Sequence, residues 1–359
     1  MKGNKGEWSE LYALLKLAAD GRLYAADENI NRIDTIYYDI LKIIRSQKDD
    51  NWHYIRNGKI KIVAESTNTE IVAVPISEFE KNAKQLLSSI KAVNSKRGSF
   101  RIPDVASFIS KIKCNSTKAK PTDKTDITLM IHDVKAGGDS TLGFSIKSQL
   151  GSPPTLFNAS GATNFVYELD GHSLTESEKD TFHNFKLFKD KFDYLDSLGV
   201  NMLFVKTENE IFNANLMLVD TQMPLIVGNM LENFYRNKAN KIVELTNLCV
   251  TNNICNISDE NKKVFYAYKV KELMTDIALG MMPASRWNGN YEATGGYIIV
   301  KEDGDILCYH IYNRNEFREY LFNNTKFDTP SKSKHHFGVI EEINSKQILK
   351  LNLQIRFVK

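Results

Sequence analysis

Two apolar runs joined by a turn-forming connection constrain the fold of this chain most strongly. The first run, Ile127–Ile131, begins directly after Asp126, and the second surrounds Phe144–Ile146 and ends in Lys147. The connection between them contains VKAGGDST, which is rich in Gly, Asp and Ser and therefore favours a β-hairpin. Adjacent antiparallel strands place Asp126 and Lys147 at related ends of one sheet. An acid and a lysine held in this way can bind a divalent metal and orient a water molecule against a phosphate.

The length of the chain bears on its domain organisation. At 359 residues it exceeds the usual size of a single domain, so we expect one large domain or two intertwined domains. A boundary is expected near residue 210, which separates 1–210 from 211–359. No low-complexity stretch or internal repeat marks a linker there.

Composition is that of an ordinary folded soluble protein, with 42% hydrophobic and 25% charged residues. No apolar run approaches the roughly 20 residues that cross a bilayer, and the first residues, MKGNKGEWSE, lack the apolar segment of a signal peptide. We therefore expect a cytoplasmic protein with no membrane partner. A net charge of +3 neither demands nor excludes nucleic acid, because a basic groove can coexist with an acidic surface elsewhere.

Hydrophobic periodicity predicts a mixed α+β fold with an α/β core. In EWSELYALLKLAA, residues 7–19, apolar side chains recur at intervals of three and four, and Asp20-Gly21 supplies a stop, so this segment is the clearest helix. Further helical periodicity covers residues 77–90, 108–112, 174–197, 211–230, 241–250 and 264–279. Strands are expected at residues 22–26, 35–44, 53–56, 59–64, 70–75, 164–169, 202–206 and 349–357, with a hairpin around Asp303-Gly304.

The residues of the first hairpin and the first helix fit phosphodiester hydrolysis. This reaction needs a metal to neutralise phosphate charge and activate water, together with a cation for the charge that develops. Magnesium takes oxygen ligands and keeps several waters, so Asp126 with Glu10 or Glu7 of the first helix would suffice. Lys147 would position the water or stabilise the phosphorus. The same residues also fit solvated first-turn acids and a surface ion pair of Asp126 with Lys147, and spacing alone favours the ion pair.

The chain resembles a known group of nucleases at these positions. Ser145-Ile146-Lys147 occupies the (E/Q/S)-x-K tripeptide of the PD-(D/E)XK nucleases, and Asp126 occupies the acid that begins the preceding strand. Three longer stretches are more specific, namely GEWSELYALLKLAADGRLYAADENIN, FSIKSQLGSPPTLFNASGATNF and GGYIIVKEDGDILCYHIYNRNEFREYLFNNTKFDTPSKSKHHFG. They look like the HpaII family of type II restriction endonucleases, at both ends and in the middle of the chain.

This resemblance implies a fold and an activity. The implied fold is a PD-(D/E)XK restriction-endonuclease-like mixed sheet flanked by helices, with a nuclease core and metal site in 1–210. The additional helical and β-hairpin part, 211–359, is expected to recognise DNA. The implied reaction is Mg²⁺-dependent cleavage of double-stranded DNA at a short palindrome, and CCGG is the first candidate for this site. The implied partner is a methyltransferase that protects the same sites in the host DNA. A palindrome also favours a two-fold homodimer.

Site residues can be carried over by position. The resemblance makes Asp126 the first metal ligand and Lys147 the catalytic lysine. Ser145 stands where most of the superfamily has a carboxylate, and because a hydroxyl is a poor metal ligand, this departure counts against a second metal. It favours completion of the site by Glu10, or else by Glu7.

Three further residues adjoin this set. Gln149 lies two residues past Lys147 on the same strand face, where it could contact the attacking water or a phosphate. Asp123 and Asp133 are fallback acids. Asp133 follows Asp126 by seven residues on an extended run, so it is expected to point to the opposite face.

Recognition of a G·C-rich site calls for Arg or Lys against guanine and for hydrogen-bonding groups in loops. Candidates in loops or at element ends are Asn158, Ser160, Thr163, Arg286, Asn288, Arg314 and Arg318. Lys332 and Lys334, followed by His335-His336, form a basic tip that could clamp the DNA backbone. The polar residues of 155–163 also fit plain turn chemistry, and the paired histidines have no third metal ligand nearby in the sequence.

Two other functions remain open. A DNA-binding protein with a degenerate nuclease fold is consistent with Ser145, and a nuclease of the same superfamily could act on branched or damaged DNA. A phosphate-binding NTPase is disfavoured because no GxxxxGK[ST] loop is present. A serine hydrolase is disfavoured because no GxSxG elbow is present.

Overall fold

The computed structural model describes residues 1–47, 50–94, 98–116, 125–133 and 137–358. The chain forms two compact units, and neither is one continuous segment. The first unit contains 1–154 and 292–320, and the second contains 155–291 and 321–358. The distribution of roles expected for 1–210 and 211–359 stays a prediction.

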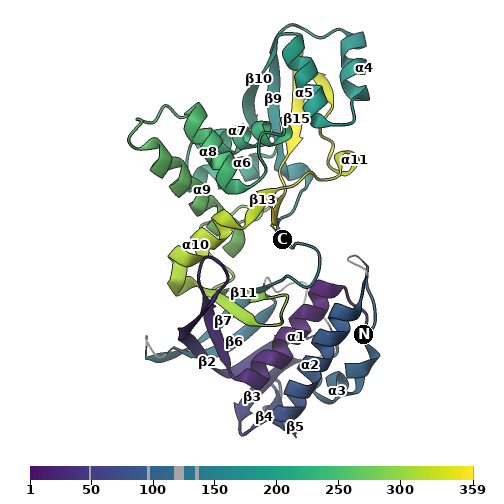
Figure 1. Cartoon of the computed structure of the whole chain (residues 1–359), viewed down its shortest axis with the longest axis vertical. Helices are drawn as coiled ribbons and strands as arrows, with labels where there is room; N and C mark the ends of the chain where they lie inside the picture. Colours follow the sequence, from purple (N-terminus) through teal and green to yellow (C-terminus); the bar gives the residue numbers. More distant parts are fainter. Residues whose placement is uncertain (48–49, 95–97, 117–124, 134–136, 359) are drawn as a thin grey trace. The chain divides into compact units, whose positions relative to one another are not determined.

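The first unit is built on a nine-stranded mixed sheet (Figure 1). Its strand order is β1-β12-β11-β7-β6-β2-β3-β4-β5, and a further pairing of β1 with β2 connects the first strand of this order to the sixth. β7 runs parallel to β11, and β1 runs parallel to β12, whereas the other pairs are antiparallel. The strands are β1 (Arg22–Ala26), β2 (Arg32–Ser46), β3 (Asn51–Asn57), β4 (Lys59–Ala64), β5 (Thr69–Val74), β6 (Ile127–Asp133), β7 (Gly138–Ser148), β11 (Gly296–Val300) and β12 (Ile306–His310).

Helices pack against this sheet and complete the α+β class that the sequence predicts. They are α1 (Lys5–Asp20), α2 (Ile76–Ala92), η1 (Pro103–Val105), α3 (Ala106–Lys111), η3 (Ile311–Asn313) and α10 (Arg314–Asn323), the last of which ends in the second unit. α1 and α2 lie side by side (Figure 1). Leu11 and Leu15 of α1 share one buried core with Leu129 of β6 and Phe144 of β7. This core fixes the face of α1 that meets the sheet.

The ends of α1 follow from local sequence. The Asn4 side chain accepts a hydrogen bond from the Glu7 amide, and the Glu7 carboxylate accepts one from the Asn4 amide, which makes a reciprocal N-terminal cap. The helix ends at Gly21, which has φ of 70° and donates its N–H to the Leu17 carbonyl. The expected helix at 7–19 is therefore confirmed, with one more residue at its C-terminal end and two more at its start.

The hairpin expected between Asp126 and Lys147 is also confirmed. β6 pairs antiparallel with β7, with Ile127 opposite Phe144 and Asp133 opposite Gly138. Burial alternates along β6, with Ile127, Leu129 and Ile131 buried, as expected of a strand with one face on the core. The chain returns to this sheet after residue 291, because β11 pairs with β7 and then with β12.

The second unit holds two smaller sheets and seven α-helices that lie wholly within it, among the described residues. The sheet orders are β10-β9-β15-β14 and β13-β16-β8. The strands are β8 (Thr155–Phe157), β9 (Asn164–Gly171), β10 (Val200–Thr207), β13 (Thr325–Phe327), β14 (Ile340–Ile343), β15 (Lys346–Asn352) and β16 (Ile355–Phe357). The helices are η2 (Gly161–Thr163), α4 (Glu176–Asn184), α5 (Phe188–Ser197), α6 (Glu210–Val219), α7 (Met223–Tyr235), α8 (Ile242–Asn252), α9 (Lys262–Leu279) and α11 (Lys332–His335).

Three sequence expectations for this unit are wrong in detail. The helical region expected at 174–197 is two helices, α4 and α5, with residues 185–187 between them. The single helix expected at 211–230 is two helices, because α6 ends at Val219 and Pro224 stands in the first turn of α7. The single strand expected at 349–357 is β15 and β16, which belong to different sheets. No helix in the described part of the chain has the length and apolar character to span a membrane.

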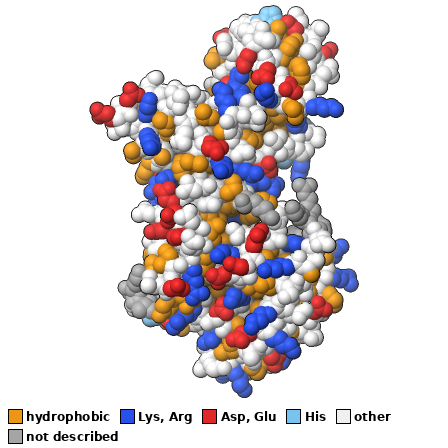
Figure 2. All heavy atoms as spheres, in the orientation of Figure 1, with side chains coloured by type: hydrophobic (Ala, Val, Ile, Leu, Met, Phe, Trp, Pro, Cys, Tyr) orange, Lys and Arg blue, Asp and Glu red, His pale blue; other side chains and the backbone are white. Residues whose placement is uncertain are grey.

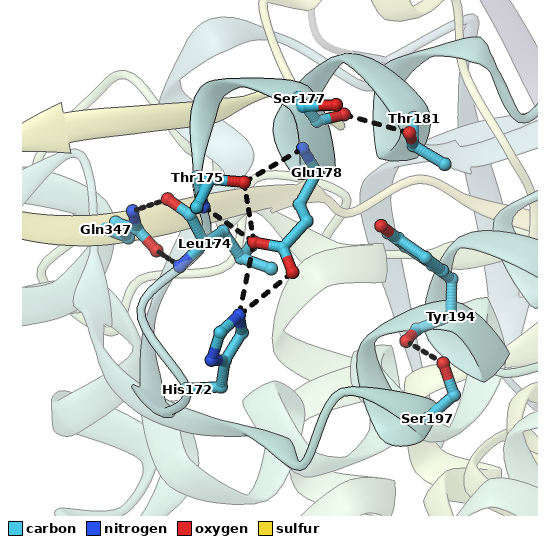
Figure 3. Close-up of polar contacts among 9 residues, drawn as sticks. All are labelled: His172, Leu174, Thr175, Ser177, Glu178, Thr181, Tyr194, Ser197 and Gln347. Atoms are coloured by element: carbon cyan, nitrogen blue, oxygen red, sulfur yellow. Dashed lines mark hydrogen bonds and ion pairs between the residues drawn. The ribbon is translucent and has the colours of Figure 1, made fainter.

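The start of α4 shows how side chains shape the second unit (Figure 3). The Thr175 hydroxyl accepts a hydrogen bond from the Glu178 amide, and the Glu178 carboxylate accepts one from the Thr175 amide at 2.7 Å. His172 Nε2 lies 3.0 Å from Glu178 Oε1, and the Gln347 amide pairs with both backbone groups of Leu174. Hydrogen bonds from Thr175 lower the pKa of Glu178. This cluster is fully explained as a helix cap.

Candidate active site

Asp126 stands at the first position before β6 and is held by the neighbouring strand. Its backbone N–H donates to the Phe144 carbonyl at 2.9 Å. Its Oδ2 accepts a hydrogen bond from the Ile146 N–H at 2.6 Å and one from the Ser145 hydroxyl at 3.1 Å. These two bonds orient the carboxylate against β7 through Oδ2, and neither of them uses Oδ1.

Lys147 lies on the same face of β7 as Ser145, because side chains alternate along a strand. The burial pattern agrees, since Phe144, Ile146 and Ser148 are buried whereas Ser145 and Lys147 are partly exposed. The Lys147 ammonium lies 5.1 Å from the centre of the Tyr297 ring, which belongs to the adjacent strand β11. The Tyr297 ring therefore packs against the Lys147 side chain.

The electrostatic surroundings of Lys147 connect three of the predicted residues. Burial lowers the pKa of Lys147 from its usual value, and the negative charges of Asp126 and Glu10 act in the opposite direction. The charges of both carboxylates therefore favour the ammonium form. Ser145 and Lys147 lie on β7, Asp126 directly precedes β6 and is bonded to Ser145, and Glu10 on α1 is linked to this group through its charge.

The two glutamates of α1 have different surroundings. Glu7 belongs to the N-terminal cap, where its carboxylate oxygens accept from the backbone amide of Asn4 at 3.1 Å and from the Asn4 side chain at 2.9 Å. Glu10 lies one helical turn further on and acts on Lys147. The adjoining Ser9 hydroxyl accepts from Ser148 of β7 at 2.8 Å, which fixes this turn of α1 against the strand. Because the carboxylate of Glu7 is used by the helix cap, we expect Glu10 rather than Glu7 to be the acid of the site.

We expect Glu10→Gln to reduce the single-turnover rate of DNA cleavage by about 100-fold, which is typical of the loss of one electrostatic contributor. Glu7→Gln is the matched control on the same helix, because glutamine also serves at this capping position and should change the rate less than about threefold. Thermal unfolding of both variants checks that α1 is intact. A larger loss of cleavage in Glu7→Gln than in Glu10→Gln would contradict this assignment.

The remaining residues expected near the site have the following positions. Gln149 directly follows β7, is partly buried, and donates its backbone N–H to the Val300 carbonyl at 2.9 Å. Asp133 is buried at the far end of β6 on the face of Ile127, opposite to that of Asp126. Asp123 lies outside the described residues. Within those residues, no group of three or more His, Cys, Asp or Glu side chains is placed to hold a metal.

The predicted DNA-contacting residues are divided between the units. Arg314 is exposed and Arg318 is partly buried, and both lie on the part of α10 that belongs to the first unit. The others belong to the second unit, in the turn after β8, in the loop after α9 and on α11: Asn158, Ser160, Thr163, Arg286, Asn288, Lys332 and Lys334.

Within the turn after β8, only part of the predicted set is exposed. Asn158 is exposed, but Thr163 is fully buried, and its hydroxyl donates to the Ser160 carbonyl at 2.9 Å. The Ser160 hydroxyl in turn accepts from the Ala162 amide at 3.2 Å. The alternative of plain turn chemistry therefore describes Thr163 and Ser160 better than a direct contact with DNA.

Two buried asparagines that the sequence did not single out join this turn to the basic tip. The side-chain amide of Asn352 donates to the Ser160 carbonyl at 2.7 Å and to Asn164 Oδ1 at 2.6 Å. The Asn164 amide donates to the carbonyl of His335, the last residue of α11, at 3.1 Å. The turn 158–163 and α11 are thus held together. No local pattern marks these residues, because their partners lie far away in the sequence.

The basic tip differs at its two lysines. Lys334 is exposed, whereas the Lys332 ammonium lies 4.2 Å from the centre of the Phe188 ring, and burial lowers the pKa of Lys332. Burial and the charge of Lys332 lower the pKa of Lys191 to about 8. Burial is therefore the main cause of the lowered pKa values near α11, and the charge of Lys332 adds to it at Lys191.

Charge over the visible surface is mixed. Figure 2 shows Lys and Arg side chains interspersed with Asp and Glu side chains on the face that it draws. This distribution agrees with the small net charge of +3. Attraction of a polyanion on that face would depend on local groups of cations rather than on a uniformly basic surface.

Comparisons with known proteins agree along the whole chain. A model of the HpaII restriction endonuclease family matches residues 4–357. The type II restriction enzyme HpaII of Haemophilus parainfluenzae is 44% identical over 356 residues, which cover 99% of this chain and 98% of that enzyme. No solved structure matches the chain significantly. The matched region includes both units and every residue of the candidate site.

Proposed function

The chain belongs to the HpaII restriction endonuclease family, and from this premise we propose a type II restriction endonuclease that cuts double-stranded DNA at CCGG. We assign its first unit to the PD-(D/E)XK fold. The observation that carries the proposal is the geometry of the hairpin, where the Ser145 hydroxyl and the Ile146 N–H of β7 hold the Asp126 carboxylate beside the strand that carries Lys147. A strand-held acid, a helix acid and a lysine are the groups that phosphodiester hydrolysis requires.

The donor atoms of this site fit Mg²⁺. Type II restriction endonucleases generally need divalent metal ions, and Asp126 and Glu10 offer the carboxylate oxygens that Mg²⁺ prefers. When bound, the ion supplies charge neutralisation at the phosphate and a lower pKa for its water. The Ser145 hydroxyl and the Ile146 N–H both donate to one oxygen of the Asp126 carboxylate. These two groups therefore orient the carboxylate that would bind the metal. One metal ion suits this set of carboxylates.

Lys147 supplies the cation of the reaction. The side chain is partly buried, and the negative charges of Asp126 and Glu10 favour its ammonium form against the effect of burial. There it can donate a hydrogen bond to the attacking water or to a phosphate oxygen, and its charge opposes the negative charge that develops on phosphorus. The Tyr297 ring lies against this ammonium, and its face favours the positive charge.

The proposed site has consequences for partners. CCGG is a palindrome, so two copies related by a two-fold axis would present one active site to each strand, and we propose a homodimer. Host DNA that contains CCGG must be protected from the enzyme, which requires a cognate methyltransferase in the same cytoplasm. In the second unit, Lys332, Lys334 and Asn158 are proposed to contact the DNA backbone.

The test is digestion of an unmethylated plasmid with Mg²⁺ or with a chelator, followed by sequencing of the fragment ends. We expect discrete fragments that all end at CCGG, and none in the chelator. Duplex binding without a cut in any divalent metal would instead indicate a degenerate DNA-binding protein. Nicking that follows DNA structure rather than sequence would indicate a repair-type nuclease.

A further inference from the structure

The segment that follows α9 in the second unit is an exposed loop with a fixed shape. Met281 and Pro283 are buried, and the side chains beyond them are largely exposed, including Arg286 and Asn288. Residues 281–291 read MMPASRWNGNY, so the segment contains an arginine and two asparagines but no carboxylate. Arg and Asn are side chains that form bidentate hydrogen bonds with guanine and adenine edges.

One buried side chain from another helix holds the first half of this loop. Asn215 of α6 is 1% exposed. Its amide nitrogen donates to the carbonyls of Met282 and Ser285, both at 2.9 Å. Its oxygen accepts from the Trp287 backbone N–H, also at 2.9 Å. Both amide hydrogens and the oxygen are thus used by one segment, which fixes the backbone on either side of Arg286.

The second half of the loop is closed on itself. The Trp287 indole donates to the Asn290 carbonyl at 2.9 Å, and the Asn288 side chain accepts from the Asn290 N–H at 3.1 Å. Gly289 between them has φ of 87°, a backbone conformation that favours glycine. The Trp287 ring stacks on Tyr291 with ring centres 6.5 Å apart. These contacts leave Arg286 at the surface of a preorganised loop.

We propose that Asn215 is a positioning residue for DNA sequence discrimination. It holds the loop 285–291 so that Arg286 meets a guanine edge of the recognition site, and it does not itself touch DNA. This inference rests on the proposed endonuclease function. A loop fixed before binding loses little conformational entropy on contact and presents its hydrogen-bond donors in one geometry. A wrong base then leaves those donors unpaired, and the complex is weaker.

The experiment measures single-turnover cleavage of two kinds of duplex. The cognate duplex contains the recognition site found by sequencing the plasmid fragment ends, and each other duplex has one base pair of that site substituted. We expect Asn215→Ala and Arg286→Ala each to lower the ratio of cognate to substituted cleavage by about tenfold or more. In the double variant, the ratio should fall no further than in either single variant, because both changes remove the same contact. Asn213→Ala is the matched control, since Asn213 is an asparagine of the same helix whose side chain contacts Met217.

Three outcomes would overturn the inference. The first is an unchanged ratio in Arg286→Ala, a result that needs no change in the core and so holds even where Asn215→Ala fails to fold. The second is an equal loss on all duplexes in Asn215→Ala, which indicates a structural role alone. The third is additive losses in the double variant. A wild-type chain that cuts nothing would refute the proposed function, and the ratio of affinities for a CCGG duplex and for duplexes with one substituted base pair would still test the loop.

Discussion

Asp126→Asn should lower the single-turnover cleavage rate by about 1,000-fold, at the upper end of the effect expected from one electrostatic group. The change removes the charge that would bind the metal but keeps an oxygen that can accept from the Ile146 N–H, so the strand geometry survives. Affinity for the uncut duplex, measured by gel shift in Ca²⁺, should stay within about threefold of wild type.

The matched control for this change is Asp139→Asn. Asp139 is an exposed acid on the other end of the same hairpin, where it pairs with His132 at 2.7 Å. Its loss should leave cleavage unchanged, because exposed ion pairs contribute less than about 1 kcal/mol. Equal losses in the two variants would mean that the hairpin needs its charges only for folding, and the site would then lie elsewhere.

Lys147→Ala should lower the single-turnover rate by about 100-fold with duplex affinity retained. The reason is that the change removes the positive charge on which the Asp126 and Glu10 carboxylates act and that opposes the charge developing on phosphorus. Lys301→Ala serves as the control, since Lys301 follows the neighbouring strand β11 and pairs with Asp303 at 3.4 Å. Cleavage at the wild-type rate by Lys147→Ala would remove the lysine from the mechanism.

Local signals in the sequence were sufficient for the parts of the site that depend on neighbouring residues. The hairpin that carries Asp126 and Lys147 could be predicted because its strands alternate in polarity and its connection is rich in turn residues. The sequence left the choice between Glu7 and Glu10 open. In the structure Glu7 forms the reciprocal helix cap with Asn4, and the role of Glu10 in the site stays a prediction.

The features that could not be predicted depend on contacts between residues far apart in the sequence. The segment 292–320 returns to the first unit without any linker-like composition, so no boundary in the sequence shows it. Thr163 lies in a segment that has the composition of a surface turn. It is nevertheless buried, because Asn352 from a strand far away in the sequence completes its hydrogen bonds. The break between β15 and β16 is set by pairing with β9 and β8 rather than by any Gly or Pro.

The central claim is that one metal ion binds between Asp126 and Glu10, and iron-mediated cleavage of the protein itself tests it most directly. Fe²⁺ replaces Mg²⁺ at oxygen-ligand sites, and with ascorbate and peroxide it cuts the polypeptide beside its ligands. Mass spectrometry of the full chain should find cuts near residues 10 and 126 that excess Mg²⁺ suppresses. Cuts confined to the neighbourhood of His335 and His336, or elsewhere in the second unit, would contradict the account.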